Sequence, residues 1–563
     1  MSPAACRSPD ASHPFKSRPD IVAPRLDITL RNGNLLSPGL YFLAPFKGYV
    51  STPMIFDNNG DLVWSGSDAY AGTEGPGPHV YDFHTCNFEK STHICMLRGF
   101  NDQGFARGQG IILDAHYQPV KHVSGSGVAT SCDLHEFTTT ESGETALITQ
   151  YRRRLHDASR LAEGHGMIWL LEGVFQEIDI KSGRVLFEWR SLDHVDPTES
   201  LVRLTTGSRS NPWDYLHLNS VEKLPDGNYL VSGRHLSTVF KISSRDGSII
   251  WRLGGKQSTF AGMDPAFVFQ HQVKVLADDG KVTRLSMFDN ARRPAFKPER
   301  PSKGLIIQLD HLSRTAQIEK QYSGPGVEYT AKIAGSTHVL PNDNVLVGFG
   351  DAGCFAEYTK DGTPGLKACI GDVSVGTLYR VYKSEWVGRP LNEVAIVSFS
   401  RTNTSSTAFY ISWNGATEVK RWRVLGALDP DGPFSDVVHA PKKGFETTIT
   451  TANHVAKAYV EALSATDEVL GKSAVVTTFV PSKAVVDQCD DLWCAEPRQC
   501  MAAAANAPSA PSTHQRTLGF SNDWQQIPFV QACLINLMVT LTLVLLLRYA
   551  RGRSRIVSRI AGW

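Results

Sequence analysis

The sequence predicts an all-β protein, a six-bladed β-propeller followed by a small β-sandwich of the immunoglobulin or fibronectin type. From about residue 27 to 391, short strand-like runs are separated by Gly, Asp and Asn turns. Two hairpin types alternate there, one led by a histidine and one ending in an aromatic strand. The leading histidines recur at intervals of roughly 50 to 80 residues, the length of one four-stranded blade with its loops. They are His135, His217, His271 and His338.

From about residue 395 the pattern changes to alternating strands at sandwich-like spacing, with Trp413 and Trp422 as the expected core anchors. A segment rich in Ala, Pro, Ser and Gln follows and reads as a stalk. The expected parts are a disordered N-terminus (1–24), the propeller (25–392), the sandwich (393–482), the stalk (483–526), a transmembrane helix (527–547) and a basic tail (548–563).

The transmembrane prediction rests on an uncharged, mostly apolar run from Ile527 to Leu547, since a bilayer core takes roughly 20 residues. Arginines follow this run and no acidic residue does, so the positive-inside rule places the tail in the cytosol. The first 20 residues have no hydrophobic core and show no signal peptide. Either the precursor starts upstream or the segment inserts tail-first with the opposite topology. We expect a single-pass protein whose propeller is lumenal or extracellular.

A net charge of +1 gives no overall attraction to nucleic acid or anionic membranes, so no nucleic-acid partner is expected. Any function based on charge must therefore be local. The cysteines fall into close groups that predict short disulfides in an oxidising compartment, while free cytosolic thiols remain an equal alternative. The groups are Cys86/Cys95, Cys354/Cys369 and Cys489/Cys494/Cys500, and the last lacks zinc-like spacing.

Residues 214–235, "DYLHLNSVEKLPDGNYLVSGRH", form the most informative hairpin. With a symmetric turn at Pro-Asp-Gly-Asn, Asn219 opposes Arg234, and His217 is the diagonal neighbour of Arg234. Side chains alternate along a strand, so these three share one face and His235 points the other way. A bulge would shift the register by one residue and break this cluster.

The innermost strand of each propeller blade lines a central channel, so the four leading histidines are predicted to meet at one mouth of it. Together with Asn219 and Arg234 they form a cationic, donor-rich pocket whose preferred guest is a small oxyanion. His338 has no polar companions and is the weakest member of this group. Three further histidines are expected at the surface, namely His84, His93 and His165, whereas Phe83 and Phe137 are expected in the core.

Several motifs are missing. "HEFTT" at His135 lacks the second histidine of a zinc HExxH motif, and no GxSxG nucleophile elbow occurs. "TDEVLGKS" has Thr466 where a phosphate loop needs its first glycine. No metal and no cofactor are therefore expected.

Several segments resemble the arylsulfate sulfotransferase family, in particular its fungal branch. They are "RPDIVAPRLDITLRNGNLLSPGLYFLAPF", "DNNGDLVWSG", "CDLHEF", "DYLHLNSVEKLPDGNYLVSGRH" and "FQHQVKVLADDG" with the later "FDNA". The resemblance covers most of residues 18–480. It implies a six-bladed propeller that moves a sulfuryl group from a small aryl sulfate donor to a phenolic acceptor without the nucleotide sulfate donor.

By the same resemblance, His271 is the histidine that becomes transiently sulfated, and His217, Asn219 and Arg234 hold the sulfate. His135 is a further funnel histidine, and either His135 or His217 moves the phenol proton. A covalent intermediate of this kind predicts ping-pong kinetics. Gln272 stands where the bacterial motif has a small residue, so the acceptor side is expected to differ. The alternative function is a membrane-anchored propeller that binds small anionic or sulfated ligands without turnover.

Overall fold

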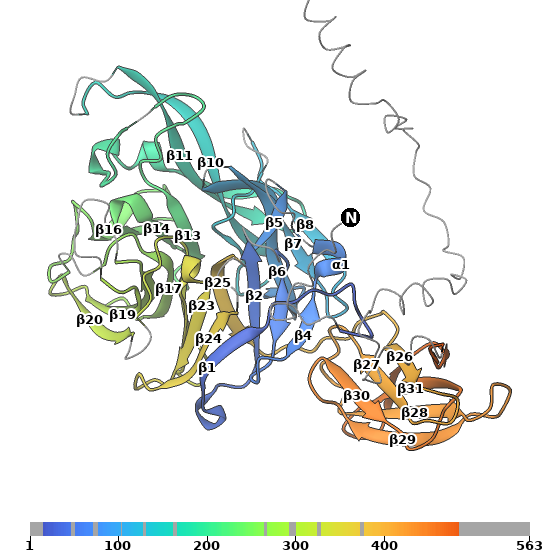
Figure 1. Cartoon of the computed structure of the whole chain (residues 1–563). Coiled ribbons are helices and arrows are strands. Elements are labelled where there is room, and N and C mark those ends of the chain that lie inside the picture. The colour runs from blue at the N-terminus through green and yellow to red at the C-terminus, as the bar shows by residue number, and fades with distance from the viewer. Residues whose placement is uncertain are drawn as a thin grey trace, which may run out of the picture. The chain divides into compact units, whose positions relative to one another are not determined.

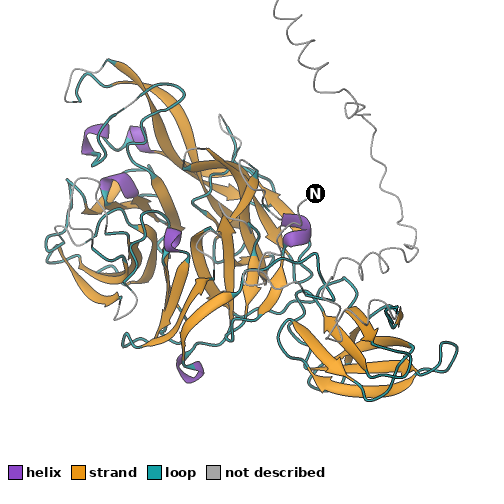
Figure 2. Cartoon of the chain, viewed as in Figure 1, coloured by secondary structure: helices purple, strands orange, loops and turns teal. Residues whose placement is uncertain are grey.

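The computed structural model describes residues 15–46, 51–70, 72, 77–102, 104–127, 131–161, 166–205, 207–263, 267–291, 300–323, 328–371 and 376–482. These residues are almost entirely strands and loops, as Figure 2 shows. The short helices among them are α1 (Ser67–Tyr70) and the 3-10 turns η1 (Gly33–Leu35), η2 (Ser191–Asp193), η3 (Pro197–Glu199), η4 (Arg234–Leu236) and η5 (Gly350–Ala352).

The predicted stalk, transmembrane helix and basic tail lie outside the described residues, and so do residues 1–14 of the predicted disordered N-terminus. Among the helices that the structure describes, none has the length and apolar character needed to cross a bilayer. The membrane anchor and the lumenal position of the propeller stay predictions.

Six antiparallel sheets follow one another up to Ser384 (Figure 1). Five have four strands, and the sixth has a fifth strand at its edge. In order from the innermost strand, the first three sheets are β25 (Thr377–Ser384), β2 (Leu40–Phe46), β3 (Met54–Phe56), β4 (Leu62–Ser65); β5 (Pro78–Phe88), β6 (Ser91–Asp102), β7 (Phe105–Leu113), β8 (Pro119–Val123); and β9 (Phe137–Thr139), β10 (Thr145–Asp157), β11 (Met167–Asp179), β12 (Val185–Arg190).

The other three sheets run in the same sense. They are β13 (Leu218–Lys223), β14 (Tyr229–Gly233), β15 (Thr238–Ile242), β16 (Ile249–Gly254); β17 (His271–Asp278), β18 (Val282–Asp289), β19 (Lys303–Asp310), β20 (Thr315–Tyr322); and β21 (Ser336–Val339), β22 (Val345–Gly348), β23 (Cys354–Tyr358), β24 (Pro364–Ile370), β1 (Leu26–Arg31).

A separate hydrophobic cluster fills each of the six interfaces between consecutive sheets, including the one between the sixth and the first. The sheets therefore close into a ring, which is the arrangement of a β-propeller. Each strand contributes side chains to the cores on both faces of its sheet, because successive side chains point to opposite faces. Along β2, for example, Tyr41 and Leu43 pack toward the sixth sheet, while Phe42 and Ala44 pack toward the second.

The first and last strands of the propeller pair with each other and close the ring. The early strand β1 pairs with β24 at the outer edge of the sixth sheet. The next strand, β2, pairs with β25, the innermost strand of the first sheet. The chain thus crosses the junction between first and sixth sheets twice, and each crossing adds a ladder of backbone hydrogen bonds.

The remaining described strands form two sheets that share one hydrophobic core. Trp413 and Trp422 are both buried in that core, as predicted. One sheet contains β26 (Ala395–Ser400), β27 (Thr407–Ser412) and β30 (Glu446–Thr450); the other contains β28 (Arg421–Ala427), β29 (Ser435–Pro441), β31 (Lys457–Leu463), β32 (Val469–Lys472) and β33 (Val476–Thr477). Two packed antiparallel sheets make this part a β-sandwich.

Two of the predicted disulfides are present, Cys86–Cys95 and Cys354–Cys369. The first links β5 to β6 and the second links β23 to β24. Such bonds are typical of proteins that fold in an oxidising compartment. The third predicted group, Cys489/Cys494/Cys500, lies outside the described residues.

Candidate functional site

Three of the predicted histidines lie where the innermost strands of the third, fourth and fifth sheets begin. His135 precedes β9, His217 precedes β13 and His271 is the first residue of β17. The rings of His135 and His217 meet edge to face, with their centroids 4.7 Å apart and an interplanar angle of 87°. Tyr151 lies beside both rings, at 5.8 and 6.0 Å between centroids. Histidines from distant parts of the sequence are thus gathered in one place.

The register of the 214–235 hairpin differs from the prediction. The pairing of β13 with β14 shifts between Leu218 and Ser220, which leaves Asn219 in a bulge and not opposite Arg234. Arg234 lies beyond the end of β14, in the turn η4. The cluster nevertheless survives, because the Arg234 backbone N–H donates to the His217 carbonyl at 2.9 Å. The turn keeps Arg234 close enough for its charge to act on His217.

His235 was predicted to point away, and this prediction is wrong. Its ring lies 4.7 Å from that of His217, at an angle of 32°. Arg234 Nη1 donates to His235 Nε2 at 2.9 Å, and His235 Nδ1 donates to the Asp214 carbonyl at 2.6 Å. Burial is the main cause that lowers the pKa of His235 to about 3, so the ring is neutral at pH 7. We call His135, His217, His235 and His271 the histidine cluster.

Arg234 carries the positive charge of this site. Its Nη2 donates to the Lys332 carbonyl at 3.0 Å, and its guanidinium carbon lies 4.7 Å from the centre of the Phe269 ring. The residue is 8 % exposed. A carbonyl, the His235 ring and an aromatic face together fix the orientation of this planar cation.

Asn219 is linked to His271 through Gln270, the residue directly before His271. Asn219 is fully buried and its Nδ2 donates to the carbonyl of Gln270 at 2.7 Å. His271 is 3 % exposed, and its Nδ1 lies 2.6 Å from Asn290 Oδ1. Burial, followed by the charge of Arg234, holds the pKa of His271 well below its ordinary value. The His271 imidazole is therefore neutral at pH 7.

The other two predicted histidines are paired with carboxylates. His135 Nδ1 lies 2.5 Å from Asp133 Oδ2, and His217 Nδ1 lies 2.5 Å from Asp214 Oδ2. His217 adopts a left-handed backbone conformation with φ of 51°, which its N–H to Asp214 Oδ1 bond of 3.1 Å supports. Burial is the main cause that holds the pKa of His217 well below its ordinary value, with His135 and Arg234 adding to it.

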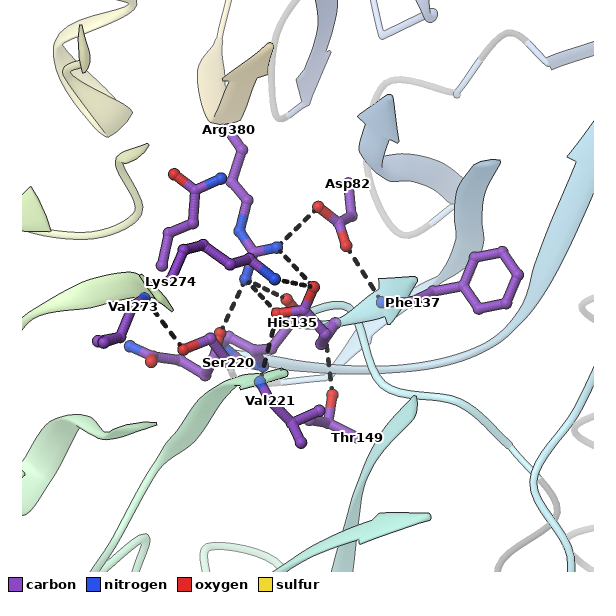
Figure 3. A network of polar contacts seen from close by, with 12 residues as sticks. Asp82, His135, Phe137, Thr149, Ser220, Val221, Val273, Lys274 and Arg380 are labelled. Atoms are coloured by element: carbon purple, nitrogen blue, oxygen red, sulfur yellow. Dashed lines mark hydrogen bonds and ion pairs between the residues drawn. The ribbon is translucent and has the colours of Figure 1, made fainter. Parts of the chain in front are cut away.

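A buried ion network ties these strand starts together (Figure 3). Arg380, on β25, is 0 % exposed in its side chain and donates to Asp82 Oδ1 at 2.8 Å and to Glu136 Oε2 at 3.1 Å. The same guanidinium donates to the carbonyls of His135 and Asn219 at 2.8 and 3.0 Å. One cation thus connects four sheets at the point where the histidine cluster stands, and sequence reasoning missed it.

The fourth leading histidine belongs to a different place. His338 lies 5.5 Å from the Tyr382 ring and lines a cavity of about 330 Å³ together with His84 and Lys274. His84 is buried, which corrects the prediction that it lies at the surface. Phe83 and Phe137 are core residues, as predicted. His165 lies outside the described residues.

Asp214, His217 and His235 bring potential metal-ligating atoms within 4.8 Å of one another. The geometry does not fit a cation. The Nδ1 atoms of both histidines are engaged by Asp214, and His235 Nε2 accepts a hydrogen bond from Arg234. A guanidinium beside the ligand set disfavours a second positive charge and favours an anion.

The described fold has distant counterparts among solved structures. One is a protein of unknown function from Bacteroides caccae, at 12% identity over 62% of this chain and 99% of that chain, with a TM-score of 0.37. Others are the hydrazine synthase of Kuenenia stuttgartiensis, at 10% identity over 55% and 71% of the two chains and a TM-score of 0.30, and a streptogramin B lyase, at 10% identity over 62% and 88% and a TM-score of 0.30. These scores are too low to bear on function.

No curated protein matches the chain. The family model for arylsulfotransferase (ASST) matches residues 90–371, about half of the chain. The matched region contains every residue of the histidine cluster as well as Arg234 and Asn219. The chain belongs to the arylsulfotransferase family.

Proposed function

We propose that this protein transfers a sulfuryl group from an aryl sulfate ester to a phenolic acceptor through a sulfohistidine on His271, without a nucleotide sulfate donor. The observation that carries the proposal is His271, a buried imidazole held at Nδ1 by Asn290 and kept neutral by burial and by the charge of the fixed Arg234 guanidinium. A neutral imidazole is a nucleophile, and a guanidinium binds tetrahedral oxyanions through paired N–H donors. The family membership supports sulfotransfer as the reaction class.

In the first step, the Nε2 lone pair of His271 attacks sulfur and forms an N–S bond. The bond from sulfur to the aryl oxygen breaks, and the phenolate leaves with its electron pair and takes a proton from water. The His271 ring keeps its Nδ1 proton and becomes positively charged. Arg234 faces the non-bridging oxygens and stabilises the charge that develops on them.

In the second step, the oxygen of the acceptor phenol attacks sulfur, the N–S bond breaks and its electron pair returns to Nε2. The phenol proton must leave in this step. His217 is suited to accept it, because its low pKa keeps it in the base form at pH 7 and Asp214 offsets the charge that it gains. His135, paired with Asp133, is the second candidate base.

Asn219 has a different part in this scheme from the sulfate ligand expected from the resemblance. One of its amide hydrogens is committed to the Gln270 carbonyl, next to the nucleophile. We assign it to holding the backbone of His271 in place.

The test uses the full chain with 4-nitrophenyl sulfate as donor and phenol as acceptor, and follows nitrophenol release. The wild type is expected to release nitrophenol with ping-pong kinetics, and His271→Ala to lose on the order of a thousand-fold or more in rate. A wild type that binds the ester but releases nothing would reject catalysis in favour of a binding propeller. Undiminished release by His271→Ala would reject His271 as nucleophile.

A further inference from the structure

The three histidines proposed for chemistry differ in the group that holds their Nδ1. For His135 and His217 this group is a carboxylate oxygen, at 2.5 Å in both cases. For His271 it is the amide oxygen of Asn290, at 2.6 Å. The three distances are alike, but the partner is a carboxylate for His135 and His217 and an uncharged amide for His271.

The orientation of the Asn290 amide is fixed by its surroundings. The side chain is fully buried, and its Nδ2 donates to the carbonyls of Ala331 and Ala334 at 2.9 and 3.0 Å. Both partners are acceptors, so the NH2 group must face them and Oδ1 must face His271. An amide oxygen only accepts hydrogen bonds, so His271 carries its proton on Nδ1. The lone pair of the imidazole is therefore on Nε2.

The backbone around Asn290 is held as firmly. Ser302 Oγ donates to the Asn290 carbonyl at 3.0 Å. The preceding residue, Asp289, accepts hydrogen bonds through Oδ1 from the backbone N–H groups of Val268 and Ala291, each at 2.8 Å. Asn290 and its neighbour Asp289 are thus anchored to the segment before the His271 strand and to the segment before β19.

The uncharged partner has a chemical consequence. When Nε2 bonds to sulfur, the ring gains a positive charge, and that charge makes the ring a good leaving group in the second step. A carboxylate at Nδ1 would neutralise the charge and stabilise the sulfated ring. An amide orients the ring without doing so. For a histidine that accepts a proton, the opposite holds, since a carboxylate partner stabilises the charged ring.

We propose, resting on the proposed function, that Asn290 is a positioning residue that holds His271 as the Nδ1–H tautomer and keeps its sulfated form reactive, whereas Asp214 makes His217 a proton acceptor. Burial and the charge of Arg234 keep the His271 ring neutral, so only one ring nitrogen carries a proton, and the Asn290 oxygen places it on Nδ1. The identity of the Nδ1 partner thereby separates the nucleophile from the bases.

Burst kinetics of nitrophenol release test this division, because the burst reports the first step and the steady state with phenol reports the whole cycle. Asn290→Ala removes the tautomer lock, so the burst rate should fall by about 10- to 100-fold. Asp214→Asn should keep the burst and slow the steady state. Equal loss of burst and steady state in Asp214→Asn, or an unchanged burst in Asn290→Ala, would overturn the proposal.

A matched control separates orientation from folding. Asn344 is also a buried asparagine, and its Nδ2 donates to the Leu35 carbonyl at 2.8 Å and to Glu357 at 2.9 Å. Asn344→Ala should cost similar stability and leave the burst unchanged. If Asn344→Ala slowed the burst as much as Asn290→Ala does, the effect would be structural and the assignment would fail.

A second readout does not depend on turnover. Nitrogen NMR of 15N-histidine-labelled protein distinguishes the two neutral tautomers, and His271 is identified as the signal missing in His271→Gln. The wild type should show Nδ1–H for His271 at pH 7, and Asn290→Ala should shift it toward Nε2–H. An Nε2–H or charged His271 in the wild type would overturn the inference, even in a protein that transfers sulfate. An inactive wild type with the Nδ1–H form would instead fail the proposed function alone.

Discussion

The innermost strands carry histidines at two places, at their starts and further along. The two places differ in whether a hydrogen bond fixes the imidazole ring. At the strand starts, His135, His217 and His271 each have Nδ1 bonded to a side-chain oxygen. Further along, His338 lines the 330 Å³ cavity, and its Nδ1 has no hydrogen-bond partner among the described residues. Both places carry buried polar side chains. What distinguishes them is orientation, and a catalytic imidazole needs a fixed lone pair.

The Arg380 network lies between these two stretches, and breaking it should have the largest effect. Arg380→Met leaves Asp82 buried without the guanidinium and Glu136 with Lys274 alone, which should lower the free energy of unfolding by roughly 3–5 kcal/mol. Sulfotransfer per folded molecule should also fall, because the guanidinium holds the carbonyls of His135 and Asn219. Urea unfolding and nitrophenol release measure the two effects.

Lys383→Met is the matched control for this prediction. Lys383 is also on β25 and also fully buried against a carboxylate, Glu357, at 2.7 Å. Its loss should destabilise the ring by a similar amount without altering the activity of the folded fraction. Equal loss of activity per folded molecule in both variants would mean that Arg380 has no special tie to the histidine cluster.

Replacing one histidine from each stretch sharpens the comparison. His217→Gln should reduce steady-state transfer to phenol by about 10²- to 10⁴-fold, the usual worth of a positioned base. His338→Gln should transfer at close to the wild-type rate, since the Nδ1 of His338 has no hydrogen-bond partner among the described residues. Steady-state rates with 4-nitrophenyl sulfate and phenol measure both variants. A strong defect in His338→Gln would mean that the reaction takes place at the 330 Å³ cavity and not at the histidine cluster.

Acid stability gives the smallest expected effect. Burial is the main cause that lowers the pKa of His338 to about 4, with His84 and Lys274 adding to it, whereas an unfolded histidine has a pKa of about 6.5. Between these values the unfolded chain binds the extra proton, so stability falls as pH drops from 6.5 to 4, by at most about 1.4 kcal/mol per pH unit.

His338→Gln should flatten that part of the stability curve, as measured by denaturant midpoints at a series of pH values. His93, at an exposed hydrogen-bonding position on β6, supplies the control in His93→Gln. The same slope in wild type and His338→Gln would show that His338 titrates normally.

Sequence reasoning could predict the sheets because their signal is local. Turns such as Leu-Pro-Asp-Gly-Asn impose a reversal, and Gly227 there has a φ of 85° that favours glycine. The histidine-led hairpins open each of the third to sixth sheets, which locates His135, His217 and His271 at equivalent positions. Repetition also misled in one case, since His338 shares the pattern but lies within β21 and lines the 330 Å³ cavity away from the histidine cluster.

The errors at the site arose from backbone irregularity and long separation. A bulge at Asn219 and the turn at Arg234 cannot be predicted from alternation, and together they moved His235 into the cluster. Arg380 meets its carboxylates across more than half of the propeller sequence, so no local pattern marks it. The carboxylate partners had a visible signal, because Asp133 and Asp214 stand two and three residues before their histidines.

The double crossing of β1 and β2 at the junction between the first and sixth sheets has a mechanical consequence. A pull on the two ends of the ring loads the β1–β24 and β2–β25 ladders along their strands, so that many hydrogen bonds must shear at once instead of parting one by one. A fragment that lacks β1 keeps only the β2–β25 ladder, and one that lacks β1 and β2 loses both ladders at this junction.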